Sequence, residues 1–468
     1  MDRIVGIGGK KLSHSGYHPA RYNSMRQPPS AVLYGSLRPS ITHDTSTHLW
    51  RSPSQRQITL LIPAHRLSLV RYTNPIYVRD CERGAVIPPI DLTEQFKLIQ
   101  AEVNAAVAEV LASGQYINGP IVQSFTKAFG RSVGTDYCVA CNSGTDALYL
   151  ALRALNIGPG DEVITSPFTF IATAEVISAV GATPVFVDID IDTFNLDITG
   201  LEAAITPRSR AIIPVHLFGR PVDMGPLLDI ASRHQLAVVE DCAQATGATW
   251  QGKPVGSLGQ VGCFSFFPTK NLGGCGDGGA ITTNDPNLAA TVTMLREHGS
   301  RVRYYHEAIG INSRLDSLQA AILDIKLRYL EQWNQQRALI AQRYDVLLAD
   351  VEGIVPPQAP TFGQSVWNQY TIRITGATAE GQERNQIQQR MREAGVISMV
   401  YYPIPLHLQE VYQSLGYKPG DFPQSEAAAH QVLSLPMFPE LDVDRQEIIA
   451  NTLKQVLVEA GLKTAQYC

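Results

Sequence analysis

The sequence lacks any apolar run near the roughly 20 residues needed to span a bilayer. Its most apolar stretches, residues 211–215 and 236–239, are short. Cysteine is scarce as well, with 7 in 468 residues and no dense spacing among them. This excludes a disulfide framework and favours a reducing compartment. We therefore expect a cytoplasmic protein without a membrane partner.

Acidic residues are scarce in the first 85 residues, which hold 12 Lys or Arg against 4 Asp or Glu, although the whole chain carries a net charge of −5. This segment has no sustained periodicity and cannot bury enough apolar surface to fold by itself. We interpret residues 1–85 as a basic, poorly ordered extension. A targeting peptide and a misassigned start site are both open, and nucleic-acid binding is disfavoured because the basic residues are dispersed.

The rest of the chain is long enough for two domains with a large buried core. Apolar side chains at helical spacing predict a helix at Thr93–Ser113. Short apolar segments then alternate with amphipathic ones. The predicted strands are Tyr137–Ala140, Glu162–Thr165, Pro184–Val187, Ala211–Val215 and Ala237–Val239, and the predicted crossover helices are Thr145–Leu155, Ile171–Val180 and Met224–His234. Strands that are apolar throughout are typical of a parallel sheet covered on both faces, which predicts an α/β fold.

A smaller second domain is predicted at the C-terminal end. A long helical stretch from Leu315 to about Leu348 leads to a strand at Trp367–Ile374 and a helix at Arg384–Ala394. We expect residues 86–335 to form the large domain with its leading helix, and residues 336–468 to form a small α+β domain.

Pyridoxal phosphate requires an amine for its aldehyde, an acid that keeps its pyridine nitrogen protonated, and an anion site for its phosphate. Lys270 is the candidate amine, because it ends the apolar and aromatic segment Phe264–Lys270 and precedes a glycine-rich turn. Desolvation there would lower its pKa and make it a nucleophile. The alternative is a surface lysine, which is the usual place for this residue type.

Other residues supply the acid, the phosphate site and a ring to stack on. Asp241 ends the strand-like segment Leu236–Asp241, and ligands of open α/β sheets bind at the carboxyl ends of strands; a helix N-cap is its alternative role. Ser143–Thr145 follows a strand and opens a helix, as a phosphate site does, although such residues are usually only caps. Phe170 is placed to stack on the pyridine ring, or else to be a core aromatic.

Three other patterns do not predict sites. Cys138 and Cys141 have metal-like spacing but no second pair of ligands, and in a strand their side chains point to different faces. The acidic repeat Asp188–Asp192 is not followed by the glycine and glutamate of a calcium loop. Residues 6–9 have neither the strand nor the helix of a dinucleotide site. No metal site is expected.

The chain resembles the DegT/DnrJ/EryC1/StrS family of nucleotide-sugar aminotransferases over about Ile87 to Glu459. The motifs that carry the resemblance are, in order, Ser143–Leu148, Phe168–Thr173, Pro184–Asp190, Glu240–Ala245, the Lys270 segment, Asn312–Asp316 and Tyr402–Leu408. The resemblance implies a fold-type-I transferase with a mixed seven-stranded sheet, a small C-terminal domain, and a homodimer with its two active sites at the interface.

The resemblance also implies roles for individual residues. Lys270 would be the Schiff-base lysine and proton shuttle, and Asp241 would face the pyridine nitrogen. The other implied cofactor contacts are Gln244 near the ring hydroxyl, Gly144, Thr145 and Ser265 at the phosphate, Phe170 on the ring, and Asn312 at the phosphate of the neighbouring subunit's cofactor. The implied sugar contacts are Arg314, Tyr401, Tyr402 and His407.

The implied reaction is transfer of an amino group from L-glutamate to a keto group of a nucleotide-linked sugar, for deoxyamino-sugar or surface-polysaccharide biosynthesis. Relatives that dehydrate the sugar carry His where this chain has Lys270. The loop Tyr402–Gly416 is most similar to members that aminate carbon 3, and carbon 4 is the alternative. Tyr401 and Asn368 stand where many members have His, which weakens the substrate assignments. A catalytically idle, regulatory relative is disfavoured by the retained cofactor residues.

Overall fold

The computed structural model describes residues 86–375 and 381–461. The predicted basic extension, residues 1–85, lies outside the described residues, and its interpretations stay predictions. Within the described ranges, no helix combines the length and the apolar character that crossing a bilayer requires.

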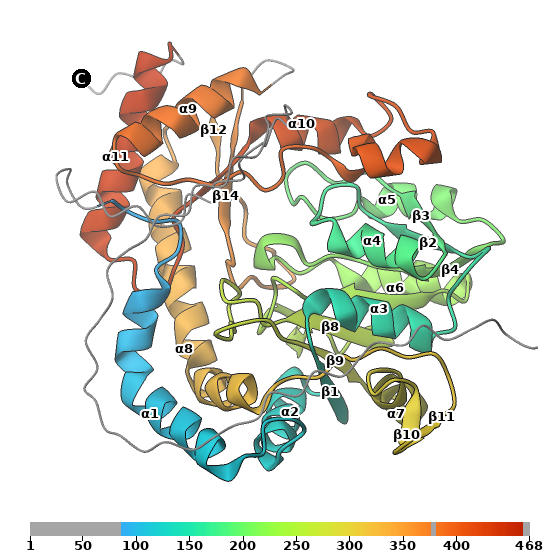
Figure 1. Cartoon of the computed structure of the whole chain (residues 1–468). Coiled ribbons are helices and arrows are strands. Elements are labelled where there is room, and N and C mark those ends of the chain that lie inside the picture. The colour runs from blue at the N-terminus through green and yellow to red at the C-terminus, as the bar shows by residue number, and fades with distance from the viewer. Residues whose placement is uncertain (1–85, 376–380, 462–468) are drawn as a thin grey trace, which may run out of the picture. The chain divides into compact units, whose positions relative to one another are not determined.

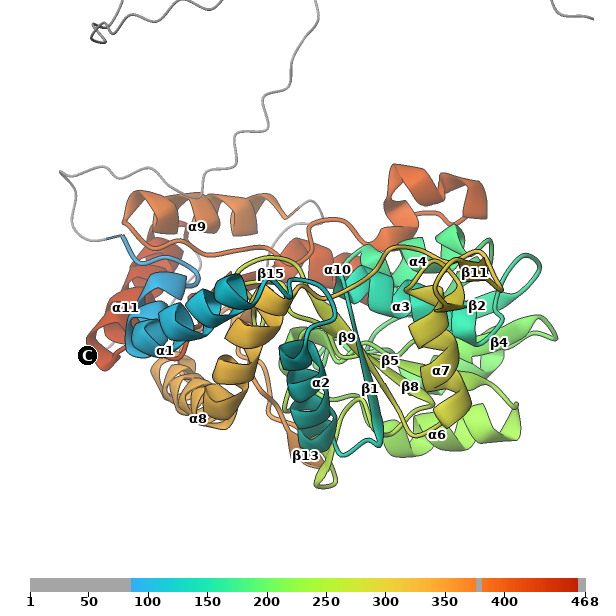
Figure 2. The same cartoon turned by 60° about the horizontal axis from the view of Figure 1, so that its bottom comes forward.

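The leading helix is confirmed as α1 (Leu92–Ser113). Asp91 caps its N-terminus by accepting hydrogen bonds from two backbone N–H groups, and Gly114 ends it with a φ of +66°. This helix lies beside the long α8 (Ser317–Leu348), as Figures 1 and 2 show. Ile99 of α1 shares a buried apolar cluster with residues of α8.

A mixed seven-stranded sheet follows, in the order β1-β9-β8-β5-β4-β2-β3, and confirms the predicted fold class. Its strands are β1 (Tyr137–Cys141), β2 (Glu162–Thr165), β3 (Thr183–Phe186), β4 (Ser209–Ile212), β5 (Ala237–Asp241), β8 (Val261–Ser265) and β9 (Gly279–Thr283). Only β9 runs antiparallel to the others in this sheet. The five strands predicted from apolar runs are all present and mutually parallel, whereas β8 and β9 were not predicted.

Helices cover both faces of this sheet, as strands that are apolar throughout require. One face is covered by α3 (Gly144–Ala154), α4 (Ala172–Ala179) and α7 (Pro286–Leu295). The other face is covered by α2 (Pro120–Val133), α6 (Met224–Arg233) and the start of α8. The three predicted crossover helices correspond to α3, α4 and α6.

The C-terminal part has its own core. A three-stranded sheet in the order β12-β14-β15 packs with α9, α11 and the later part of α8. The new elements are β12 (Ile354–Val355), β14 (Tyr370–Ile374), α9 (Gln382–Glu393), β15 (Val432–Leu435) and α11 (Val443–Glu459). The strand predicted from Trp367 begins later because Trp367 has a φ of +49°, which extended backbone excludes. The predicted domain boundary at residue 335 falls inside α8, so the division into two domains stays a prediction.

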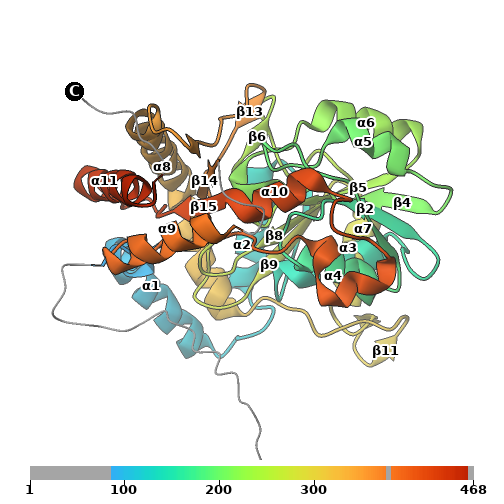
Figure 3. The ribbon, with the colours of Figure 1, turned by 90° about the horizontal axis from the view of Figure 1, so that it is seen from above.

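Helix α10 (Pro423–Gln431) lies between the two sheets (Figure 3). Asp188, which follows β3, caps it, since its carboxylate accepts hydrogen bonds from the backbone N–H groups of Gln424 and Ser425, both at 2.9 Å. The acidic repeat therefore has a structural role that needs no calcium ion. The remaining short elements are α5 (Ile198–Leu201), β6 (Thr249–Trp250), β7 (Lys253–Pro254), β10 (Ser300–Val302), β11 (Tyr305–His306), β13 (Gly363–Gln364) and 3-10 turns at Glu202–Ala204, Leu217–Gly219, Leu406–Leu408 and Glu410–Leu415.

Candidate functional site

The candidate residues converge at one edge of the seven-stranded sheet. The carboxyl ends of its parallel strands meet there, and this is where open α/β sheets bind ligands. Loops that leave β1, β2, β5 and β8 at this edge carry Ser143–Thr145, Phe168–Thr173, Asp241–Gln244 and Ser265–Lys270. The topology therefore brings the predicted amine, acid and phosphate site together.

Lys270 lies in a tight turn after β8. Its backbone N–H donates to the carbonyl oxygen of Phe267 at 2.9 Å, which closes the turn. Burial lowers the pKa of Lys270 to about 8, although the charge of Asp241 acts in the opposite direction. An amine with this pKa is partly neutral near neutral pH, so it can act as a nucleophile and exchange protons.

Asp241 is buried at the end of β5, with 5% of its surface exposed. Its Oδ1 accepts a hydrogen bond from the backbone N–H of Ala243 at 3.1 Å, and its Oδ2 accepts one from Thr173 Oγ1 at 2.8 Å. Burial raises the pKa of Asp241, and these two bonds and the charge of Lys270 partly oppose that shift. No described helix begins at Asp241, so the N-cap alternative is wrong. A carboxylate has about four acceptor positions, so two remain for a ligand.

The N-terminus of α3 forms a cup beside β8. Ser143 caps the helix by accepting a hydrogen bond from the backbone N–H of Asp146 at 3.0 Å. Gly144 and Thr145 begin the helix, where backbone N–H groups have no partner inside the helix. Gly144 allows a close approach to β8, because a Cβ atom there would lie 2.7 Å from the Cβ of Ser265. Helix N–H groups, the helix dipole and a serine hydroxyl suit a phosphate.

Gln244 and Tyr402 reach the site from distant parts of the chain. Gln244 Nε2 donates to Tyr402 Oη at 3.2 Å, and its Oε1 accepts the backbone N–H of Phe218 at 2.7 Å. The ring centroids of Tyr402 and Phe170 are 6.1 Å apart. Phe170 is 56% exposed, so it is not a core aromatic. Its ring is open to a flat ligand, and stacking on the cofactor stays a prediction.

Two residues to which the sequence analysis gave no role support this site. Thr173 lies in a quoted motif but was given no role, and its hydroxyl binds Asp241. Asn368 is 1% exposed, and its Nδ2 donates at 2.8 Å to Oδ1 of Asn271, the residue after Lys270. Nothing in the sequence linked Asn368 to the Lys270 turn, because 97 positions separate it from Asn271.

Asn312 and Arg314 lie on a segment that follows the β10–β11 hairpin. Between them, the buried Ser313 ties the segment to the phosphate cup, because its Oγ donates to Oδ2 of Asp146 at 2.6 Å. Asn312 is exposed, and Nη1 of Arg314 lies 3.4 Å from Oε2 of Glu297. The assignments of Asn312 to a neighbouring subunit's cofactor and of Arg314 to the sugar stay predictions.

The other two predicted sugar contacts differ in exposure. Tyr401 is half-buried, with its ring centroid 5.8 Å from that of Tyr402. His407 is 1% exposed, and its Nε2 lies 3.0 Å from Oε1 of Glu426. A sugar contact by His407 would require this loop to rearrange, and both assignments stay predictions.

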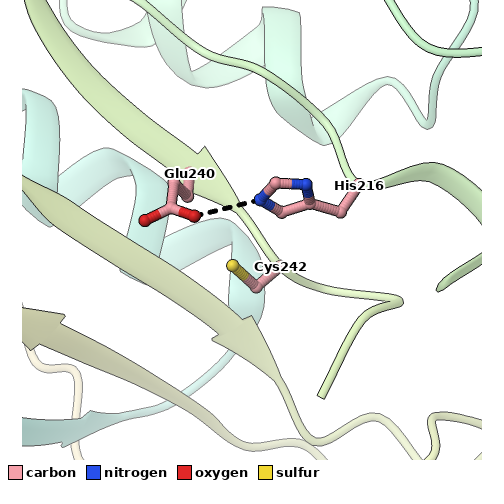
Figure 4. A group of neighbouring side chains, drawn as sticks. All are labelled: His216, Glu240 and Cys242. Carbon is pink, nitrogen blue, oxygen red and sulfur yellow. Dashed lines mark hydrogen bonds and ion pairs between the residues drawn. The ribbon is translucent and has the colours of Figure 1, made fainter. Parts of the chain in front are cut away.

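A second polar cluster lies around the end of β5, beside the site. Potential ligand atoms of His216, Glu240 and Cys242 lie within 4.8 Å of one another (Figure 4). The buried carboxylate of Glu240 accepts four hydrogen bonds, from Nε2 of His216 and from the backbone N–H groups of Gly256, Leu258 and Gly259. Nδ1 of His216 accepts the backbone N–H of Val222 at 3.0 Å, so Nε2 carries the proton. The atoms of Glu240 and His216 that could bind a metal are thus already hydrogen-bonded to protein groups. This arrangement suits a cluster that stabilises the fold better than a metal centre.

Comparison with known proteins identifies relatives along most of the chain. A sequence model of the DegT/DnrJ/EryC1/StrS aminotransferase family matches residues 97–454. A pleiotropic regulatory protein of Geobacillus stearothermophilus is 46% identical over 371 residues, which cover 79% of this chain and 98% of that protein. The UDP-2-acetamido-2-deoxy-3-oxo-D-glucuronate aminotransferase of Pseudomonas aeruginosa is 45% identical over 364 residues, which cover 78% of this chain and 98% of that protein.

Solved structures have the same fold. DesV of S. venezuelae, solved in complex with a ketimine intermediate, matches with a TM-score of 0.76 and 43% identity, over 79% of this chain and 98% of that chain. Other matching structures hold the cofactor PMP or are in a PLP form. These three matches span 86–98% of the length of the solved chains.

Proposed function

Because the chain belongs to the DegT/DnrJ/EryC1/StrS aminotransferase family, we propose that it moves an amino group from L-glutamate to carbon 3 of a nucleotide-linked keto sugar. The chain is a pyridoxal-phosphate-dependent sugar aminotransferase; the donor, the carbon and the residue roles are the proposed part. The observation that carries the proposal is the half-buried Lys270, which interacts electrostatically with Asp241 at the carboxyl edge of the sheet. The 3-oxo sugar in the name of the Pseudomonas relative supports carbon 3.

The residues at this edge fit pyridoxal phosphate. A Cβ atom at Gly144 would lie 2.7 Å from the Cβ of Ser265, so glycine lets the start of α3 lie close to Ser265, and the first N–H groups of α3 would hold the phosphate beside that hydroxyl. Asp241 would hold the protonated ring nitrogen, and Phe170 would lie on the ring. When bound, the cofactor supplies an electron sink, which makes loss of a proton from the amino donor's α-carbon possible.

Lys270 would move the proton. A pKa of about 8 leaves part of the amine neutral near neutral pH, and the neutral Nζ accepts the proton from the donor's α-carbon. In its ammonium form the same atom returns a proton. In the second half of the reaction, Nζ removes and delivers protons in the reverse order, so that one lysine serves both halves.

Asp241 would keep a proton on the nitrogen that it faces. Its buried carboxylate keeps two acceptor positions free after binding Thr173 and Ala243. In a buried site, where water screens charge poorly, a carboxylate stabilises a facing cation strongly. The half-buried ring of Tyr402, held by Gln244, would exclude water from one side of this pair.

The first test follows the visible absorbance of the purified, cofactor-loaded protein while L-glutamate is added. We expect the cofactor's band to change with release of one 2-oxoglutarate per site, and Lys270→Ala to show no such change. Lys253→Ala, which alters an exposed lysine on β7, is the matched control and should behave as the wild type. A Lys270→Ala protein that still converts glutamate would refute the assignment.

The second test offers the glutamate-treated protein a 3-keto and a 4-keto nucleotide sugar. Carbon-3 transfer predicts an amino sugar from the 3-keto compound, together with return of the original spectrum. Product only from the 4-keto compound would replace carbon 3 with carbon 4 and leave the rest of the proposal intact.

We also propose a homodimer in which Asn312 serves the partner's site; the exposure of Asn312 supports this. Co-expression of Lys270→Ala and Asn312→Ala chains tests it. A mixed dimer would contain one site with both residues intact, so activity should return although each variant alone is inactive or weak. No recovery would place Asn312 in its own subunit's site.

A regulatory role without catalysis is the second candidate, because one relative is a pleiotropic regulatory protein. This candidate predicts cofactor binding without conversion of L-glutamate. Conversion in the first test would therefore exclude it.

A further inference from the structure

Two buried threonines lie behind Asp241. Thr173 is the second residue of α4 and is 1% exposed, and Thr169, in the turn before α4, is 3% exposed. Thr173 Oγ1 lies 2.8 Å from Asp241 Oδ2, and Thr169 Oγ1 lies 3.2 Å from Thr173 Oγ1. The two hydroxyls and the carboxylate thus form a buried hydrogen-bonded chain.

The direction of this chain follows from what each group can donate. An ionised carboxylate only accepts, so Thr173 donates to Asp241. The one hydroxyl proton of Thr173 is then used, so Thr169 must donate to Thr173. Hydrogen bonds in such a chain polarise one another, and Thr169 therefore strengthens the bond that Asp241 accepts.

We propose that Thr173 is a positioning residue for the reaction, which holds the Asp241 carboxylate in one orientation and in its ionised form, and that Thr169 supports it. The inference rests on the proposed role of Asp241. Thr173 and the backbone N–H of Ala243 bind different oxygens of the carboxylate, so rotation of the carboxylate breaks these bonds. The two free acceptor positions consequently keep a fixed direction.

The surroundings of Asp241 decide the expected pH dependence. The titratable groups that face it are Lys270, His216, Tyr402, Cys242 and Cys263. Burial raises the pKa of Asp241, whereas the hydrogen bonds from Ala243 and Thr173 and the charge of Lys270 lower it. Removal of the Thr173 hydroxyl should therefore raise this pKa further, so that the carboxylate is lost at a higher pH as the pH falls.

The test compares variants at Thr173, Thr169 and Asp241 with a control threonine. Thr173→Val keeps the shape of the side chain and removes the donor, whereas Thr173→Ser keeps the donor. Thr165→Val is the matched control, because Thr165 on β2 is also fully buried but donates to the carbonyl oxygen of Ile213 at 2.9 Å instead of to Asp241. Thermal unfolding of each variant confirms that it is folded.

Cofactor-free protein titrated with pyridoxal phosphate gives the first readout. We expect a dissociation constant on the order of 10-fold higher for Thr173→Val, since a hydrogen bond to a charged group is lost. Thr173→Ser should recover to within about 3-fold of the wild type, Thr165→Val should match the wild type, and Thr169→Val should show a smaller effect of about 2-fold. In the loaded Thr173→Val enzyme, kcat should fall by a larger factor than KM changes. The acid limb of its plot of kcat against pH should move to higher pH, whereas Thr173→Ser and Thr165→Val should keep the wild-type profile.

Wild-type affinity and an unchanged pH profile in Thr173→Val would overturn the inference. The inference would also be overturned if Thr173→Ser bound pyridoxal phosphate as weakly as Thr173→Val does. Loss of the threonine methyl group, and not loss of the hydrogen-bond donor, would then explain the weaker binding. The variant Asp241→Asn distinguishes failure of this inference from failure of the proposed role of Asp241. If it weakens cofactor binding and Thr173→Val does not, this inference alone fails; if it binds as the wild type does, the role of Asp241 fails too.

Discussion

Glu240 and Asp241 are neighbours on β5, and both are buried, yet their surroundings differ. Successive strand residues point to opposite faces. On one face Glu240 accepts four hydrogen bonds, which fills its acceptor positions. On the other face Asp241 accepts two, from Thr173 and Ala243, and interacts electrostatically with Lys270.

The difference separates a carboxylate whose acceptor positions are filled by protein donors from one that can still bind a ligand. A buried charge is tolerated when protein donors satisfy it, and Glu240 meets this condition without a ligand. Asp241 is incompletely satisfied, and its pKa is raised by burial. Perturbed groups of this kind concentrate at sites that bind or react. Equivalent substitutions at the two positions should therefore have opposite consequences.

Asp241→Asn should have the largest effect. The amide has nearly the same shape but cannot hold a cation, so we expect kcat to fall by about 10²–10³-fold, the loss seen when a preorganised electrostatic partner is removed. The midpoint of denaturant unfolding should change little. Steady-state kinetics with L-glutamate measures the first quantity, and a variant with wild-type kcat would contradict the comparison.

Glu240→Gln should lower the stability of the protein and leave kcat nearly unchanged. Its amide NH₂ would face backbone N–H donors, so we expect the free energy of unfolding to fall by about 3 kcal/mol. Urea unfolding at 25 °C measures this loss, and kcat of the folded fraction should stay within about 3-fold of the wild type. Normal stability combined with lost activity would mean that the two carboxylates had been assigned the wrong way round.

Lys270→Met should change how stability depends on pH. The folded-state pKa of Lys270, about 8, lies below its ordinary 10.5, so between these values the unfolded chain binds more protons than the folded one. The free energy of unfolding of the cofactor-free wild type should therefore rise from pH 8 to pH 10.5 relative to that of the variant, by about 2–3 kcal/mol.

Urea unfolding at pH 7 and pH 10 measures this difference, with Lys253→Met as the control for an exposed lysine. The control should keep the wild-type dependence on pH. If Lys270→Met kept this dependence as well, Lys270 would not be the amine that titrates in this range.

The smallest effect is expected from metal removal. His216 and Glu240 already use their donor and acceptor atoms on protein groups, so dialysis against EDTA should leave the unfolding midpoint of the protein unchanged. A lower midpoint that zinc restores would show that the cluster with Cys242 binds a metal, and Glu240 would then no longer be a purely structural carboxylate.

Residue patterns predicted the fold where apolar runs were continuous. The five predicted strands and the three predicted crossover helices all lie in or on the seven-stranded sheet. The strands β8 and β9 were missed because Val261–Ser265 and Gly279–Thr283 contain glycine and small or hydroxyl side chains, which local pattern does not distinguish from a loop. These segments form strands because they pair with neighbouring strands inside the sheet, where they are buried.

The sequence by itself indicated the candidate reactive groups, because a lysine after an aromatic run and an acid at a strand end are local features. It also determined the parallel core, through unbroken apolar segments. Only the tertiary structure decided which of two adjacent carboxylates stays available, that Thr173 binds Asp241 across 68 positions, and that His407 is buried against Glu426. Hydrogen-bond satisfaction and desolvation depend on neighbours that are distant in sequence, and the fold alone brings those neighbours together.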